Sequence, residues 1–85
     1  MDAYTTGQII KKLRLKNKLT QLELAKQIGV SDKTVSKWET SKGLPDISLI
    51  QPLSKALGVS VIELMSGSAI INKNVSANML RAKFY

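Results

Sequence analysis

The sequence predicts an all-α fold of five short helices, and three kinds of signal support this prediction. Apolar residues recur at helical spacing through the segment 21–38. Capping boxes, in which Ser or Thr is followed three residues later by Glu or Gln, occur at residues 5–8, 20–23 and 60–63. Gly29 and Gly58 stand where apolar stripes end, and glycine readily adopts the left-handed conformation found at helix C-termini.

The first helix is expected to begin at Thr5, with Gln8 reaching back to complete the capping box, and to end at about Asn17. Its inner side would carry Ile9, Ile10 and Leu13, and lysines occupy much of the remainder. The second helix is expected to begin at Gln21, directly after Thr20.

The segment 21–38 reads as two helices joined by a tight turn. Ala25 is small enough for a close helix crossing, Gly29 tolerates a positive φ in the turn, and Ser31 can cap the next helix. That third helix, about 32–40, would turn Val35 and Trp38 inward. This arrangement is a helix-turn-helix, whose second helix enters the major groove of DNA.

Asp46 is expected to cap a fourth helix that runs to about Leu57 and buries Ile50, Leu53 and Leu57. Pro52 falls inside it and predicts either a bend near Ser48 or a later start. The hydroxyl of Ser54 can bond to the carbonyl four residues earlier. A short fifth helix opens at Ser60 and contains Leu64 and Met65.

Composition restricts the function. The 85 residues include no Cys and no His, and no pair of carboxylates is placed to share a proton, so we expect neither an enzyme nor a bound metal or cofactor. The net charge is +7, with nine Lys or Arg against four Asp or Glu in residues 1–43, which favours a polyanionic partner. No apolar run reaches the length of a membrane span and no signal peptide is evident, so a cytoplasmic protein without membrane contact is expected.

From about Thr6 to Met65 the chain resembles the Cro/lambda-repressor-like (Xre-type) helix-turn-helix family. With Gln21 counted as the first position of the motif, Ala is fifth, Gly ninth and Val fifteenth, and apolar residues are fourth, eighth, tenth and eighteenth. The resemblance implies a compact five-helix lambda-repressor-like DNA-binding domain. It also implies a transcriptional regulator, with repression as the expected activity, that binds double-stranded DNA as a homodimer on a two-fold operator.

The chemistry of the side chains and the resemblance together suggest site residues. Asp32 either accepts from cytosine or only favours the helix N-terminus, while Thr20 and Ser31 are caps first and phosphate contacts second. The resemblance also implies an ion pair between Arg14 and Glu39, the alternative being a lone surface arginine. The expected base contacts are Asp32, Lys33, Ser36 and Lys37, and the expected phosphate contacts are Thr20, Gln21, Ser31, Thr34 and Lys42.

Residues 1–65 are expected to form the DNA-binding domain, and residues 66–85 a linker or tail that leads to a second domain or pairs two subunits. The alternative function is an antitoxin-type module that binds DNA and also a protein partner through the tail and the hydrophobic Leu22.

Overall fold

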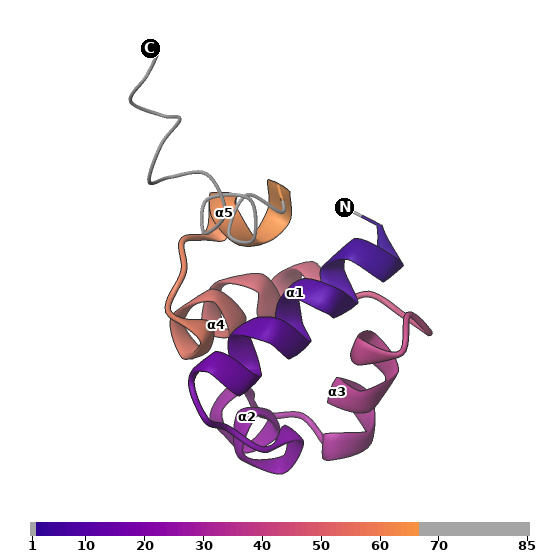
Figure 1. Ribbon diagram of the computed structural model, residues 1–85, viewed down its shortest axis with the longest axis vertical. Coiled ribbons are helices and arrows are strands. Elements are labelled where there is room, and N and C mark those ends of the chain that lie inside the picture. The colour runs from indigo at the N-terminus through magenta and orange to yellow at the C-terminus, as the bar shows by residue number, and fades with distance from the viewer. Residues whose placement is uncertain (1, 67–85) are drawn as a thin grey trace, which may run out of the picture.

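The computed structural model describes residues 2–66, which fold into five α-helices (Figure 1). The predicted all-α fold is therefore confirmed, whereas the expectations for the chain after Ser66 lie outside the described residues. In Figure 1, α3 and α5 lie on opposite sides of α1, and α4 packs against α1, α2 and α5. The helices are α1 (Ala3–Lys16), α2 (Gln21–Ile28), α3 (Asp32–Glu39), α4 (Ile47–Leu57) and α5 (Val61–Ser66).

Every helix contributes to one apolar core. The residues predicted to face inward are buried, and Leu64 joins them from α5. Burying a Leu or Ile side chain contributes about 2–3 kcal/mol, so this core supplies most of the cohesion between helices that are individually too short to be stable. The core residues are Ile9, Ile10, Leu13, Leu24, Ala25, Ile28, Val35, Trp38, Ile50, Leu53, Leu57 and Leu64.

The start of α1 differs from the prediction. Its N-cap is Asp2, whose carboxylate accepts a hydrogen bond from the Thr5 amide at 2.8 Å, so the prediction of Thr5 as N-cap was wrong. Gln8 donates instead to the Tyr4 hydroxyl at 3.0 Å. The physical reason is local: Asp is a stronger N-cap than Thr, and the Asp2 carboxylate caps the additional turn formed by residues 3–5.

Local hydrogen bonds set the other helix starts where the sequence predicted them. Thr20 and Glu23 form a reciprocal capping box, with distances of 2.8 and 3.0 Å between side-chain oxygens and amide nitrogens. Ser60 and Glu63 repeat this arrangement at the start of α5. Ser31 accepts from the Thr34 amide at 3.2 Å and so caps α3.

The interior proline of α4 is accommodated without delaying the helix. α4 begins at Ile47, directly after its N-cap Asp46, so the suggested later start is wrong, while the bend near Ser48 remains a prediction. Pro52 removes only the single amide that would have bonded to the Ser48 carbonyl. The Ser54 hydroxyl donates to the Gln51 carbonyl, three residues earlier rather than four, at 2.8 Å.

Helices α2 and α4 end at glycines in the left-handed region, Gly29 at φ 78° and Gly58 at φ 74°, as predicted. Two other helix ends use non-glycine residues in the same conformation, Lys18 at φ 59° and Ser41 at φ 63°. After α3 the Lys42 amide donates to the Lys37 carbonyl at 2.8 Å, closing the end of that helix.

Candidate nucleic-acid interface

Helix α3 has one buried side and one side open to solvent. Val35 is completely buried and Trp38 is 4% exposed, which fixes the rotation of the helix about its axis. Each residue rotates by about 100° around the helix axis, so the side chains one or two positions from these buried residues point away from the core. Asp32, Lys33 and Lys37 are exposed and Ser36 is half-buried, so the expected base-contact residues share the accessible side of α3.

A buried ion pair holds the C-terminal end of α3. Arg14 donates from Nε to Glu39 Oε2 at 2.6 Å and from Nη2 to Glu39 Oε1 at 2.9 Å. The side chains of Arg14 and Glu39 are 9% and 3% exposed. Hydrogen bonding to Glu39 raises the pKa of Arg14, which favours the charged form of the guanidinium. Arg14 Nη1 also donates to the Leu19 carbonyl at 2.8 Å, which attaches the α1–α2 turn to the same network.

Gln21 extends this network to the start of α2. Its side-chain Nε2 donates to Glu39 Oε1 at 3.0 Å, so the first residue of α2 is tied to the last residue of α3. Arg14, Gln21 and Glu39 therefore join three helices around one carboxylate. The family resemblance implied the Arg14–Glu39 pair and a contact between Gln21 and the third helix, while Glu39 as the partner of Gln21 follows from the crossing of the two helices.

The residues expected to contact phosphates lie at three points. Thr20 and Gln21 stand at the N-terminus of α2, where the first amides of the helix are directed toward solvent. Ser31 and Thr34 stand at the N-terminus of α3, and their hydroxyl oxygens are 3.1 Å apart in a hydrogen bond. Lys42 is exposed just beyond α3. Amides and hydroxyls at helix N-termini, together with a nearby cation, suit an anionic ligand.

One residue that positions the interface was not predicted. A Cβ built on Gly7 would lie 2.1 Å from the carbonyl oxygen of Trp38, so only glycine allows α1 to approach the end of α3 so closely. The available signal was a glycine within a predicted helix, because such glycines often mark a close packing contact.

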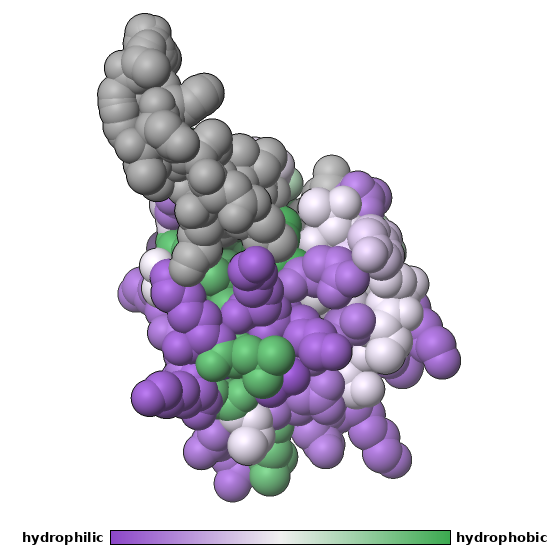
Figure 2. Space-filling model, in the orientation of Figure 1, coloured by the Kyte–Doolittle hydropathy of each residue, from purple (hydrophilic) through white to green (hydrophobic). Residues whose placement is uncertain are grey.

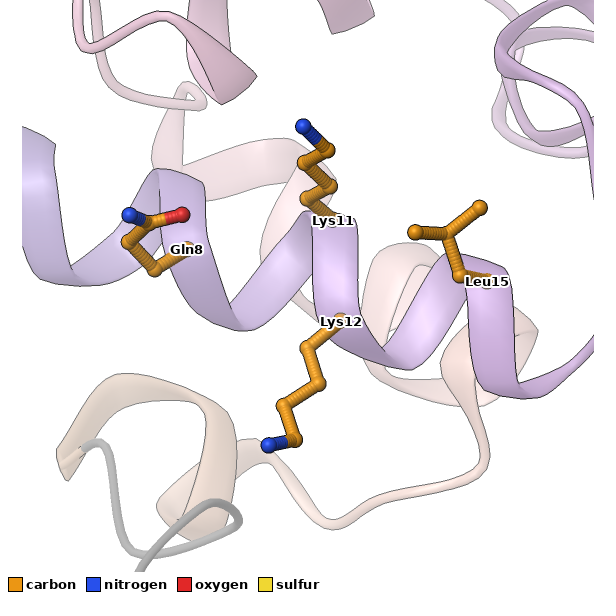
Figure 3. Close-up of a pocket in the computed structure, with 4 residues that line it drawn as sticks. All are labelled: Gln8, Lys11, Lys12 and Leu15. Atoms are coloured by element: carbon orange, nitrogen blue, oxygen red, sulfur yellow. The ribbon is translucent and has the colours of Figure 1, made fainter.

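Other parts of residues 2–66 offer no comparable site. Hydrophilic residues cover most of the face seen in Figure 2. The hollow in Figure 3 is lined by Gln8, Lys11, Lys12 and Leu15, all on α1, and Lys12 points toward α5 while Lys11 points away from it. A hollow lined by one helix is an open surface rather than an enclosed ligand site. Within this part of the chain no cluster of three metal-ligating side chains occurs, and no helix has the length and apolarity to cross a membrane.

Comparison with known proteins supports the same interpretation. Residues 10–64 match the family model described as helix-turn-helix. The chain is 36% identical over 74 residues to the HTH-type transcriptional activator BcrR of Enterococcus faecalis, covering 87% of this chain and 36% of BcrR. It is 30% identical over 66 residues to the antitoxin PezA of Streptococcus pneumoniae, covering 78% of this chain and 42% of PezA. The chain thus spans well under half of these relatives.

The repressor protein C2 of Salmonella phage P22 is similar in both sequence and structure. The sequences are 37% identical over 67 residues, which is 79% of this chain and 31% of C2. The crystal structure of the P22 c2 repressor with a synthetic operator superimposes with a TM-score of 0.69, at 39% identity over 73% of this chain and 94% of that one. These relatives are named as regulators and not as enzymes, as the sequence led us to expect. The chain belongs to the Cro/C1-type (Xre) helix-turn-helix family.

Proposed function

We propose that this chain is a sequence-specific DNA-binding regulator of transcription that places α3 in the major groove. The observation that carries the proposal is the exposed side of α3, where Lys33, Ser36 and Lys37 face away from the buried Val35 and Trp38 and Asp32 is exposed in the first turn. The membership of the helix-turn-helix family supports it.

In the proposed complex, phosphate contacts position the domain and base contacts provide specificity. The N-termini of α2 and α3, with Thr20, Gln21, Ser31 and Thr34, would bind backbone phosphates, and Lys42 would add a cationic contact. Gln21 is suited to this role because Glu39 fixes its side chain before DNA arrives. Two copies on a two-fold operator would present their reading helices about 34 Å apart, one turn of the duplex.

We propose repression as the direction of regulation. Occupying an operator is sufficient to block transcription, whereas activation needs a further surface that contacts the transcription machinery. BcrR is named an activator and C2 a repressor, so both directions occur among the relatives. A reporter fused to the selected operator would rise on deletion of the gene if the chain represses, and fall if it activates.

The test of DNA binding is selection from a random duplex pool at near-physiological salt. The wild type is expected to enrich a two-fold motif. Lys33→Ala should alter that motif, whereas Lys55→Ala should not, because Lys55 lies in the last turn of α4, which packs against α1, α2 and α5. Binding without an enriched motif, or no binding, would overturn the proposal.

We also propose that residues 1–65 form the DNA-binding domain and residues 66–85 a linker or tail. Leu64, the last core residue in the described part of the chain, lies two residues before Ser66, where the proposed tail begins. Limited proteolysis should therefore leave a fragment ending close to Ser66 that binds the same operator. Loss of binding in that fragment would show that the tail belongs to the functional unit.

An antitoxin is the second candidate function, favoured by the similarity to PezA and by Leu22, which is 50% exposed on α2. An antitoxin would bind its toxin as well as DNA, with Leu22 and the tail as the proposed contacts. Depleting the chain in its host should then arrest growth, and inactivating the neighbouring gene should restore it. Normal growth on depletion would exclude this candidate.

A further inference from the structure

The charged side chains on the open side of α3 have a restricted hydrogen-bonding chemistry, whereas the Ser36 hydroxyl both donates and accepts and does not discriminate between bases. Lys33 and Lys37 only donate, and Asp32 only accepts. In the major groove guanine presents two adjacent acceptors, N7 and O6, whereas adenine pairs its N7 acceptor with an amino donor. Cytosine presents a donor that suits a carboxylate. This set of side chains therefore matches G·C pairs better than A·T pairs.

The spacing of the two lysines matches the spacing of neighbouring bases. Residues four apart on a helix lie on one side, about 6 Å apart along its axis. Two steps along duplex DNA cover about 7 Å, at about 3.4 Å per base pair. Both Lys33 and Lys37 are exposed, so their flexible stems allow the two ammonium groups to reach bases within three successive base pairs.

Helix α3 contains no side chain of the type that recognises adenine through two hydrogen bonds. Bidentate recognition of adenine uses the amide of Asn or Gln, and α3, with the sequence DKTVSKWE, contains neither. Gln21, at the start of α2, has a side-chain amide and belongs to the same helix-turn-helix motif. Its Nε2, however, donates to Glu39, whose side chain is 3% exposed. That bond uses one of the two amide hydrogens of Gln21 and holds its side chain against α3, which leaves the second hydrogen for a phosphate oxygen.

From these observations we infer that each operator half-site carries two guanines within three successive base pairs, contacted through their major-groove edges by Lys33 and Lys37. The inference rests on the proposed function and adds the class of base that the reading helix selects. Asp32 adds a preference for cytosine, and Gln21 serves as a fixed phosphate contact rather than a base reader.

The test replaces single guanines in the selected operator by 7-deazaguanine, which keeps base pairing but lacks the N7 acceptor. Substitution at either inferred position should weaken wild-type binding about tenfold, within the discrimination expected for a lysine–guanine contact. Inosine at the same positions lacks only the minor-groove amino group and should bind like guanine. Fluorescence anisotropy at fixed salt measures each affinity.

Matched variants assign each guanine to its lysine. Lys33→Ala should lose sensitivity to 7-deazaguanine at one position and Lys37→Ala at the other, while Lys55→Ala should keep both. A selected motif without guanines in this window, or full affinity for the 7-deazaguanine probes, would overturn the inference and leave the proposed function standing. Failure to enrich any motif would overturn the proposed function as well.

Discussion

Gly7 packs directly against the backbone at the end of α3. A methyl group there would meet the Trp38 carbonyl oxygen at 2.1 Å, and a backbone atom cannot move aside without shifting α3. We expect Gly7→Ala to reduce the free energy of unfolding by at least about 2 kcal/mol, despite the roughly 1 kcal/mol that Ala gains over Gly in a helix. Urea unfolding measures this change. Gly43→Ala is the control, because a Cβ there has no atom within 4 Å, and an equal loss in both variants would contradict the packing argument.

Ser41 carries a conformation that glycine adopts more easily. Its φ of 63° lies in the left-handed region, at the position after α3 where the helix is closed by the Lys42 amide. We expect Ser41→Gly to raise the free energy of unfolding by about 0.5–1 kcal/mol, because the Cβ strain is relieved and the added chain entropy offsets only part of it. Gly58→Ala, at φ 74°, should change stability in the opposite direction. The same sign in both variants would contradict this account.

At the scale of single residues, the sequence predicted the backbone conformation at positions where one residue type adopts that conformation much more easily than the others. Gly29 and Gly58 were predicted as helix ends because glycine favours a positive φ. Lys18 and Ser41 were not, since their positive φ follows from the hydrogen bonds that close α1 and α3. The inward-facing residues of α3, Val35 and Trp38, were predicted from periodicity alone and are buried.

The Arg14–Glu39 pair joins α1 to α3 and, through Gln21, to α2. Glu39→Gln would leave the buried guanidinium without its counter-charge, so we expect a loss of about 3 kcal/mol in the free energy of unfolding. The double variant Arg14→Met, Glu39→Leu removes both charges and should recover most of that loss. Thermal and urea unfolding of the wild type and these two variants test the argument, and a double variant less stable than Glu39→Gln would contradict it.

Acid should weaken the start of α4. Hydrogen bonds from the Ser48 hydroxyl and amide to Asp46 lower the pKa of Asp46 below its usual value of 3.8. Because the folded-state pKa lies below the unfolded value, this stabilisation is present above about pH 3.8 and is lost as the pH falls through the folded pKa. Asp46→Ala should therefore lower the melting temperature at pH 7, with the difference from wild type shrinking in acid. Asp46→Asn keeps a neutral acceptor and serves as the control, and a difference that persists unchanged at pH 2 would contradict the assignment.

At the element scale, helix starts were predictable wherever the cap is a purely local contact. The starts of α2, α3, α4 and α5 follow from side chains within three residues of the first turn. The start of α1 is the exception. The Thr5–Gln8 pattern matches a capping box, but the helix begins one turn earlier, at the carboxylate of Asp2, which is the stronger N-cap.

At the scale of the whole molecule, the core and the charge together orient the candidate interface. Periodicity in the sequence was sufficient to predict which side of α3 is open. It was not sufficient to predict the bond between Gln21 and Glu39, because that contact joins residues 18 positions apart through the crossing of two helices. The phosphate contact of Gln21 was predicted from the sequence and stays a prediction, whereas the bond that fixes its side chain depends on the folded arrangement.

The net charge of +7 and the proposed phosphate contacts predict a steep salt dependence of DNA binding. Each neutralised phosphate contributes about 0.9 to the slope of log K against log salt concentration, because it releases a condensed counterion. Lys42→Ala should therefore reduce the slope by about one and weaken binding to the operator and to unrelated DNA by the same factor. Lys33→Ala should instead reduce the ratio of operator to unrelated affinity, since it removes a base contact. Affinities measured from low to physiological salt distinguish these outcomes, with Lys55→Ala as the control that changes neither quantity. A specificity ratio that falls for Lys42→Ala but not for Lys33→Ala would reverse the two roles and place the reading surface on the loop after α3.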